Sequence, residues 1–141
     1  MATPTYDPLK IVGTLAGINI IGYMSGTMVK ASRAEKTWEV VVGGQGDAAR
    51  VRKRNKSGTV VVTLMQTSPT NDEFSQLLAD DERDASGSGD LSFVDTNGTT
   101  VIEAETAWLE GYAEVTFGDG LEGREWTIAT GVLELVVGGA L

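Results

Sequence analysis

The sequence contains no cysteine and no histidine among its 141 residues. The missing cysteines exclude disulfide bonds, thiolate metal sites and cysteine nucleophiles. The missing histidines remove the commonest general base, the commonest metal ligand and any Ser-His-Asp triad. A catalytic role would have to rest on carboxylates, lysine or tyrosine. We therefore expect that the protein is not an enzyme and that it has no cofactor and no metal site.

Long hydrophobic runs are also missing. The most apolar stretch, residues 15–28, is interrupted by three glycines, an asparagine and a serine, so it is too short and too polar to span a bilayer. The first residues lack the basic segment of a signal peptide. The net charge of −9 opposes nonspecific adhesion to nucleic acid or to an anionic membrane. We expect a soluble protein without a membrane partner, made and used in the cytoplasm or released from it.

The charged residues are divided by their position along the chain. Residues 1–71 carry nine basic and four acidic side chains, whereas residues 72–141 carry two basic and sixteen acidic ones. Blocks of opposite charge in one small domain can face each other across a subunit contact, where they select partner and register. This pattern is the first indication that the protein binds copies of itself. Five basic residues lie in one short run: Arg50, Arg52, Lys53, Arg54 and Lys56.

The length and the hydrophobic pattern predict one antiparallel β domain that spans residues 1–141. Apolar residues recur mostly with a period of two and are separated by glycines, which is typical of antiparallel strands. The Asn97-Gly98 pair predicts a hairpin turn. The prediction is strongest for residues 59–66, which are apolar and rich in β-branched side chains. The predicted strands are residues 9–14, 18–23, 38–42, 49–54, 59–66, 91–95, 99–105, 113–117 and 126–137.

One segment departs from the period of two. Residues 70–73 read Thr-Asn-Asp-Glu, which is the spelling of a helix capping box. Phe74, Leu77 and Leu78 then share one face of a helix. The sequence therefore predicts a mainly β fold, an antiparallel β-sandwich or barrel, with one short flanking α-helix at about residues 69–80.

Three segments are expected to contact other subunits. The polar stretch Met24–Lys36 fits no core element, so we expect a protruding N-terminal hairpin or loop arm there. The loop at residues 43–56 carries the basic run. The acidic segment 80–90 is either a solvated loop or a docking surface for the basic run of a neighbouring subunit. The candidate interface residues are Arg50, Arg52, Lys53, Arg54, Lys56, Asp80, Asp81, Glu82 and Asp84.

Two alternatives of other functional classes remain open. Glu103 and Glu105 lie on one face of a predicted strand, roughly 7 Å apart by strand rise, which is a spacing that a glycosidase pair allows. A solvated strand face is the simpler interpretation, because nothing else in the sequence builds a sugar pocket. A carbohydrate-binding β-sandwich is the second alternative. It would need exposed aromatic side chains on one face, and the chain has only three each of Trp, Tyr and Phe.

Residues 57–71, which read SGTVVVTLMQTSPTN, resemble a segment of tail tube proteins from contractile-tailed bacteriophages. This myophage tail tube family is related to the tube proteins of secretion systems. The resemblance extends from about residue 43 to the C-terminus and rests on the order and spacing of the similar segments. The later segments are Asp95–Gly98, Glu105–Leu109, Gly123–Trp126 and Val136–Gly139.

The resemblance implies a structural virion protein of the phage tail that is assembled in the cytoplasm of the bacterial host. Six copies would form a ring, and stacked rings would form a tube whose lumen conducts DNA and holds the tape-measure protein. The implied partners are further copies of the chain, the sheath protein, the tape-measure protein, and the tail terminator and baseplate proteins. DNA would pass without specific binding, because an acidic lumen repels phosphates. Candidate lumen-facing residues within predicted strands are Glu103, Glu105 and Glu114.

Overall fold

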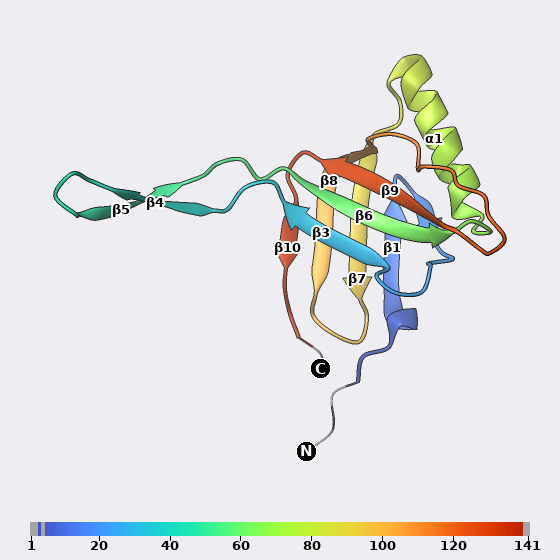
Figure 1. Ribbon diagram of the computed structural model, residues 1–141, viewed down its shortest axis with the longest axis horizontal. Coiled ribbons are helices and arrows are strands. Elements are labelled where there is room, and N and C mark those ends of the chain that lie inside the picture. Colours follow the sequence, from blue (N-terminus) through green and yellow to red (C-terminus); the bar gives the residue numbers. More distant parts are fainter. Residues whose placement is uncertain (1–2, 4, 140–141) are drawn as a thin grey trace.

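Ten strands and one α-helix form the fold in the computed structural model, which describes Thr3 and residues 5–139 (Figure 1). Most strands belong to one antiparallel sheet with the order β2-β1-β7-β8-β9-β6-β3, and β10 pairs with β8. Strands β4 and β5 form a separate hairpin. The strands are β1 Ile11–Leu15, β2 Ile18–Ile20, β3 Val29–Arg33, β4 Trp38–Val42, β5 Ala48–Arg52, β6 Gly58–Met65, β7 Gly89–Asp95, β8 Val101–Leu109, β9 Gly123–Thr130 and β10 Glu134–Val136. A 3-10 turn, η1 Pro8–Lys10, precedes β1, and the helix is α1 Thr70–Asp84.

The large sheet folds over itself at β8, which pairs with different strands along its length. The start of β8 pairs with β10 on one side, whereas its end, Ala107–Leu109, pairs with β9. Strand β9 then follows β6 away from β8, so that β3, β6 and β9 cross obliquely over β1, β7, β8 and β10 (Figure 1). In the described chain β2 and β3 are the ends of the hydrogen-bonded order, so the sheet does not close into a barrel. The prediction of a mainly β, antiparallel fold with a single helix is confirmed.

The core lies between the two layers and under the helix. Strand β6 shows the expected alternation, since Val60, Val62 and Leu64 are fully buried and the residues between them are partly exposed. On α1, Phe74 and Leu78 are buried, as the helical spacing predicts. The Phe74 ring meets the Trp126 ring of β9 edge-on, with 5.4 Å between the ring centroids. The buried side chains of the alternating strands and the apolar face of the helix thus pack into one hydrophobic core.

The helix differs from its prediction at both ends. Its N-cap is Pro69 and no side chain caps it, so the predicted capping box does not form. The hydroxyl of Thr70 binds the backbone of β2 instead, where it accepts a bond from the Ile21 amide and donates one to the Asn19 carbonyl. At the other end the helix continues to Asp84 and stops at Ala85, which adopts a left-handed conformation. The acidic residues from position 80 to 84 therefore lie on the last turn of the helix rather than in a loop.

The predicted protruding arm is present, but it lies later in the chain than the predicted bounds Met24–Lys36. The middle of this stretch, Val29–Arg33, forms β3, which pairs with β6 inside the large sheet. The projecting element is the next segment, residues 34–57, which contains the β4–β5 hairpin and extends far from the domain (Figure 1). Strand β3 is polar because its outward-facing side chains are exposed on an outer strand of the sheet, and this polarity gave the misleading signal.

Two further strand predictions differ from the structure, one wholly and one in part. Residues 113–117 form neither helix nor strand in the structure. The predicted strand 126–137 is broken at Gly131 into β9 and β10, where the sheet folds. The Asn97-Gly98 turn between β7 and β8 is confirmed, and the side chain of Asp95 accepts a bond of 3.0 Å from the Asn97 amide.

Candidate interaction surfaces

The arm, residues 34–57, is an extended two-stranded ribbon, and within the described residues its backbone hydrogen bond to the domain lies at its base. The Ala34 amide donates to the Ser57 carbonyl, and the Leu133 amide donates to the Lys56 carbonyl. Every residue of β4 and β5 is exposed, including valines at positions 40 and 42 with exposed fractions of 69% and 63%. An isolated hairpin is marginally stable in water, so a ribbon with exposed valines is suited to contact with another chain.

The two faces of the arm differ in chemistry. Strand pairing places Trp38 opposite Arg52 and Val40 opposite Arg50, and paired residues share one face of the ribbon. On this face the Arg50 guanidinium lies 4.0 Å from the centre of the Trp38 ring. The other face carries Glu39, Val41, Ala49 and Val51. One face of the arm is therefore apolar and cationic, and the other is largely apolar.

The predicted basic run lies along the returning strand of the arm. Arg50 and Arg52 belong to β5, whereas Lys53 and the later basic residues follow it toward the domain. The Lys53 ammonium lies 2.8 Å from a carboxylate oxygen of Glu39. Hydrogen bonding and charge attraction in this pair lower the pKa of Glu39 and raise the pKa of Lys53. The arginines of β5 are consequently the basic side chains most directly presented by the ribbon.

The three aspartates at the end of α1, at positions 80, 81 and 84, already have partners within their own chain. Asp80 accepts bonds from Gln76 and Arg83, and Asp81 accepts a bond from the Gly87 amide. Asp84 accepts a bond from Ser86 and lies 3.8 Å from Arg83. The structure does not bring these candidate interface residues near the basic run of the same chain, because the helix and the arm lie on different sides of the domain (Figure 1). Whether the two groups meet between copies stays a prediction.

Glu103 and Glu105 lie exposed on the outer face of β8. They border an open hollow of about 310 Å³ that Asp90 and Glu134 also line. Glu103 stands directly across from Glu134 in the neighbouring strand, and the guanidinium of Arg33 lies 3.7 Å from Glu134. This region forms an acidic patch on one face of the sheet. Beside it, a row of valines crosses four paired strands: Val12, Val94, Val101 and Val136.

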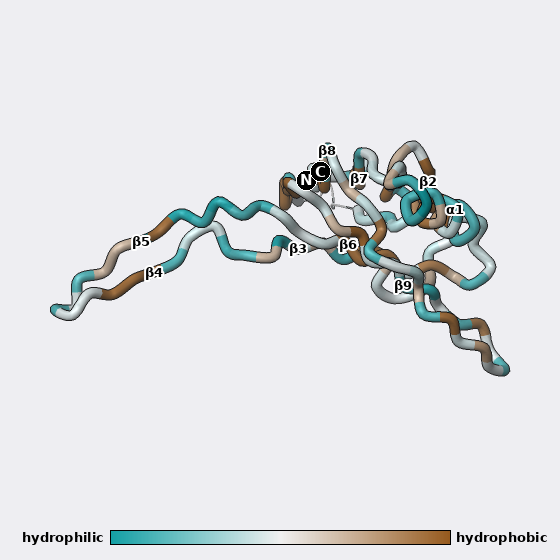
Figure 2. The backbone as a smooth tube through the Cα atoms, turned by 90° about the horizontal axis from the view of Figure 1, so that it is seen from above, coloured by the Kyte–Doolittle hydropathy of each residue, from teal (hydrophilic) through white to brown (hydrophobic). Residues whose placement is uncertain are grey.

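The third candidate lumen residue, Glu114, lies elsewhere. It belongs to a long loop, residues 110–122, that connects β8 to β9 and has no regular structure. The loop is fixed to the end of β6, because the Glu122 amide donates to the side chain of Gln66 and the Gln66 amide donates to the Glu122 carbonyl. Its tip extends to the end of the molecule opposite the arm (Figure 2). Glu114 therefore does not share a surface with the glutamates of β8.

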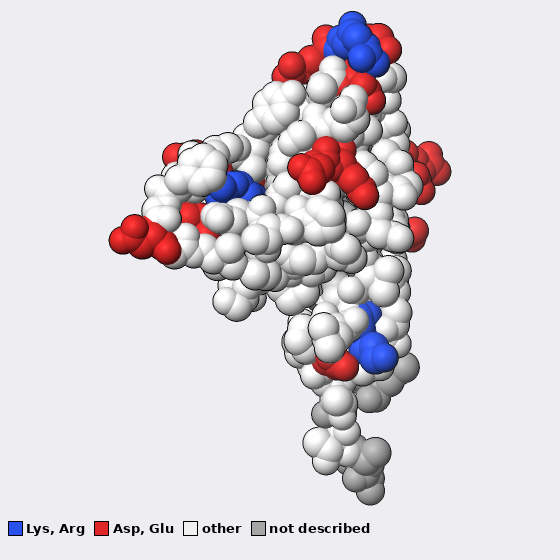
Figure 3. Space-filling view, turned by 90° about the vertical axis from the view of Figure 1, so that its right-hand side faces the viewer, with Lys and Arg blue, Asp and Glu red and all other residues white. Residues whose placement is uncertain are grey.

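This connecting loop, which we call the acidic loop, combines exposed apolar side chains with negative charge. Its four charged residues are all acidic. The exposed fraction of Phe117 is 84%, and the Arg124 guanidinium lies 5.6 Å from the centre of its ring. Figure 3 shows that acidic side chains predominate on this end of the molecule. The other exposed apolar residues of the loop are Tyr112, Val115 and Leu121.

Sequence reasoning did not foresee the network formed by residues 68–71. The Ser68 hydroxyl donates to the Ile21 carbonyl at 2.6 Å and accepts a bond from the Thr70 amide. The Asn71 amide group donates to the Met65 carbonyl at 2.8 Å. These bonds tie the start of α1 to the ends of β2 and β6. The TSP-x-N motif at residues 67–71 is part of the family resemblance, and it could have identified this junction from the sequence.

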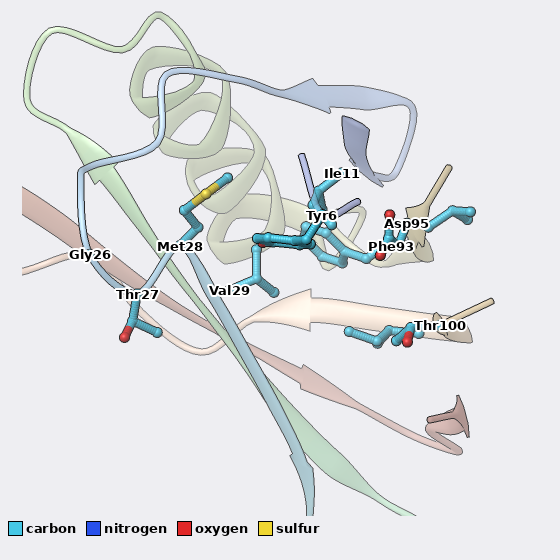
Figure 4. A pocket seen from close by; sticks show the side chains of 11 residues that line it. Tyr6, Ile11, Gly26, Thr27, Met28, Val29, Phe93, Asp95 and Thr100 are labelled. Carbon is cyan, nitrogen blue, oxygen red and sulfur yellow. The ribbon is translucent and has the colours of Figure 1, made fainter. Parts of the chain in front are cut away.

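A second, apolar cavity of about 400 Å³ lies between the layers at the open side of the sheet (Figure 4). Ile11, Met28 and Val29 line it together with the Phe93 ring. Asp95 is the only carboxylate among the lining residues, and its side chain is engaged in the hairpin turn. The cavity therefore offers neither a carboxylate pair nor a set of metal ligands. In the described part of the chain, no helix is long and apolar enough to cross a membrane.

The exposed aromatic residues do not form a platform for sugars. Tyr6 lies in the N-terminal segment and Trp38 on the arm, whereas Tyr112 and Phe117 belong to the acidic loop. Trp126 is buried in the core. Because the exposed rings are distributed over three separate segments, the carbohydrate-binding alternative gains no support from the structure.

No protein-family model matches the chain. The chain is 24% identical over 135 residues to the structural protein ORF10 of Pseudomonas phage KPP10, and the match covers 90% of this chain and 78% of that protein. The expectation that the chain is not an enzyme agrees with the description of this relative as a structural protein.

Solved structures with a similar fold come from contractile systems. The cap that terminates the tube of the anti-feeding prophage has a TM-score of 0.66 at 8% identity, with 96% of this chain and 93% of that chain covered. The sheath/tube terminator of an extracellular contractile injection system has a TM-score of 0.69 at 12% identity, with 97% and 100% covered. A chain of the sheath-tube complex from that type of system has a TM-score of 0.67 at 10% identity, with 97% and 93% covered.

Proposed function

We propose that the protein is a structural subunit of the tube of a contractile phage tail. The observation that carries this proposal is the combination of a tube-type β fold with a long exposed arm. The similarity to a phage structural protein and the fold shared with tube and terminator proteins support it. In this role, identical copies form six-membered rings that stack into a hollow tube.

The proposed role accounts for the exposed features of the single chain. An arm with valines open to water and outer strands with unpaired edges are hazards for a monomer, whereas subunit contacts would cover them. Glu103 and Glu105, exposed on one face of the sheet, are the proposed lining of the lumen. Their charge would repel the phosphate backbone, so that DNA would slide without binding specifically. Glu114 is left out of this proposed lining because it lies on the acidic loop.

The similar proteins also favour a second, closely related role. Two of the similar structures named above are described as a tube terminating cap and a sheath/tube terminator. A terminator would form a single ring on the end of a tube made by another protein, whereas a tube subunit would stack on itself. In either role the proposed partners belong to the tail: the sheath protein, the tape-measure protein, and the terminator and baseplate proteins.

Negative-stain electron microscopy of the purified protein, over a range of concentration and salt, tests the proposal. Stacked rings or hollow tubes are the expected result for a tube subunit. Single rings that never stack would favour the terminator role. A protein that stays monomeric at all concentrations, both alone and when mixed with preformed phage tubes, would contradict both roles.

A further inference from the structure

Residues 114–117 have the composition of a strand but no strand partner in the described chain. They read Glu-Val-Thr-Phe, and β-branched and aromatic residues favour strands. They nevertheless form no regular structure, and the exposed fractions of Val115 and Phe117 are 61% and 84%. A short segment of this kind is suited to adding to the free edge of a sheet in another molecule.

Strand β5 of the arm offers such an edge. It pairs with β4 on one side, and its other side is unpaired within the described residues. Its side chains alternate between the two faces of the ribbon, with Ala48, Arg50 and Arg52 on one face and Ala49 and Val51 on the other. Any strand that adds to this edge would therefore meet a basic face and an apolar face.

The alternation in residues 114–117 matches this pair of faces. In an extended segment Glu114 and Thr116 would share one face, and Val115 and Phe117 would share the other. Beside β5, the carboxylate of Glu114 would lie across from Arg50 or Arg52. Val115 would lie across from Val51 or Ala49, on the apolar face. Opposite charges and apolar pairs on adjacent strands each stabilise a sheet by about 0.2–1 kcal/mol. A register shifted by one residue would place acid against valine, so the pattern also specifies the register.

We propose that residues 114–117 of one copy add as a third strand to the free edge of β5 in a second copy. The contact deepens the proposed function, on which it rests, by naming the surface that receives the arm. The arm and the acidic loop lie at opposite ends of the molecule, so one chain cannot satisfy both halves of the contact (Figure 2). A contact between two different surfaces repeats from copy to copy, as rings and stacks of rings require.

The end of α1 is the rival acceptor for the arm, but it fits less well. Its aspartates at positions 80, 81 and 84 already accept bonds from their own chain. No large apolar side chain is exposed between residues 79 and 88. The arm presents valines and arginines together, so its acceptor must supply both apolar surface and negative charge, and the acidic loop does so.

Cysteine trapping tests the contact, because the natural chain has no cysteine that could form other disulfides. One protein carries Val115→Cys, and a second carries either Ala49→Cys or Val51→Cys on the apolar face of β5. The two proteins are mixed and oxidised at low salt, and the disulfide-linked heterodimer is measured on a non-reducing gel. We expect at least one of the two β5 positions to give heterodimer at ten times the yield of the matched control, Ala48→Cys, on the opposite face of the same strand.

Equal trapping from both faces of β5 would overturn the proposal, as would no trapping from either face at millimolar protein. Preferential trapping of β5 by Asp81→Cys or Glu82→Cys would also overturn it, in favour of the helix. Charge reversal provides a second measurement. Arg50→Glu should reduce the trapping yield, and Glu114→Arg in the other copy should restore it. Electron microscopy distinguishes the proposed tube function from the proposed strand contact. Disulfide trapping in a protein that forms no rings would contradict the tube function and would still support the strand contact.

Discussion

The indole nitrogen of Trp126 donates a hydrogen bond of 2.9 Å to the side-chain oxygen of Asn71, a residue 55 positions earlier in the chain. The amide group of the same Asn71 donates to the Met65 carbonyl at the end of β6. One side chain thus joins the start of the helix, the end of β6 and the buried tryptophan of β9. Both bonds occur at the junction where the helix covers the core.

The first prediction concerns this junction. Replacing Asn71 with Ala leaves a buried indole N–H and a backbone carbonyl without their partners, and each such loss costs about 1–3 kcal/mol. We expect Asn71→Ala to lower the free energy of unfolding by about 2–3 kcal/mol in urea denaturation. The control is Gln76→Ala on the exposed side of the same helix, which should change stability by less than about 0.5 kcal/mol. Similar effects of the two variants would contradict the structural role of Asn71.

The second prediction concerns Gly58, where the arm joins β6. A methyl group on this residue would lie 2.5 Å from a Leu133 side-chain carbon and 2.6 Å from the Ser32 carbonyl oxygen. Because these neighbours are packed, we expect Gly58→Ala to destabilise the fold by about 1–3 kcal/mol. Gly44→Ala near the arm tip has open space around it and serves as the matched control. Thermal unfolding of the two variants should separate them by several degrees, and equal melting temperatures would refute the close packing.

The third prediction concerns Tyr23, whose hydroxyl is buried without a hydrogen-bond partner in the described chain. Burial raises the pKa of Tyr23 to about 12 from an ordinary value of 10.0. Tyr23→Phe removes an unpaired polar group, so we expect a gain in stability of about 1 kcal/mol at neutral pH. A gain of this size in urea denaturation would agree with the buried hydroxyl, whereas a loss of stability would indicate that the hydroxyl has a partner in solution.

The same tyrosine gives a prediction for alkaline pH. Since its folded-state pKa is the higher one, the neutral hydroxyl binds its proton more tightly in the folded protein than in the unfolded chain. The stabilising effect of this tighter proton binding is fully present below pH 10 and is lost as the pH rises toward 12. The stability difference between Tyr23→Phe and the natural protein should therefore widen over this interval. An unchanged difference between pH 9 and pH 11.5 would contradict the raised pKa.

The fourth prediction concerns the independence of the arm. The Lys53 amide donates to the Thr37 carbonyl at 2.7 Å, so the two sides of the arm already meet there. Replacing residues 38–52 with two glycines should leave the melting temperature of the domain within about 3 °C, because every removed side chain is exposed. The shortened protein should form no stacks in the electron microscope. Stacks of normal length would show that the arm is not part of the contact.

The sequence predicted well those elements whose signal is local. The alternation in residues 59–66 gave β6, and the Asn97-Gly98 pair gave the β7–β8 turn. The helical face of Phe74 and Leu78 was also correct, because a helix buries the same side of its own residues whatever lies opposite. The capping-box spelling failed at Thr70, since a hydroxyl that could cap the helix bonds to a strand that is distant in sequence.

The candidate surfaces were harder to predict, because exposure depends on what packs against each segment. The basic run was assigned to a loop at residues 43–56, whereas the structure places it on the projecting arm. The polar residues of β3 were mistaken for an arm. Residues 113–117 have the propensity of a strand, and yet no partner strand reaches them in the part of the chain that the structure describes. Propensity describes what a residue allows, whereas pairing requires a second strand at hydrogen-bonding distance.

By itself, the sequence determined the antiparallel β class, the single helix and the division of charge, because each follows from residue type and spacing. The tertiary structure decided which segments project from the domain and which side chains share a face of the arm. It also placed the basic arm and the acidic loop at opposite ends of the molecule (Figure 2). The placement of the arm and the acidic loop follows from the antiparallel pairing of β6 with β9. The arm enters β6 at Gly58, whereas the loop enters β9 at Gly123, which pairs with Met65 at the other end of β6. This pairing joins residues far apart in the chain, which the sequence pattern alone does not reveal.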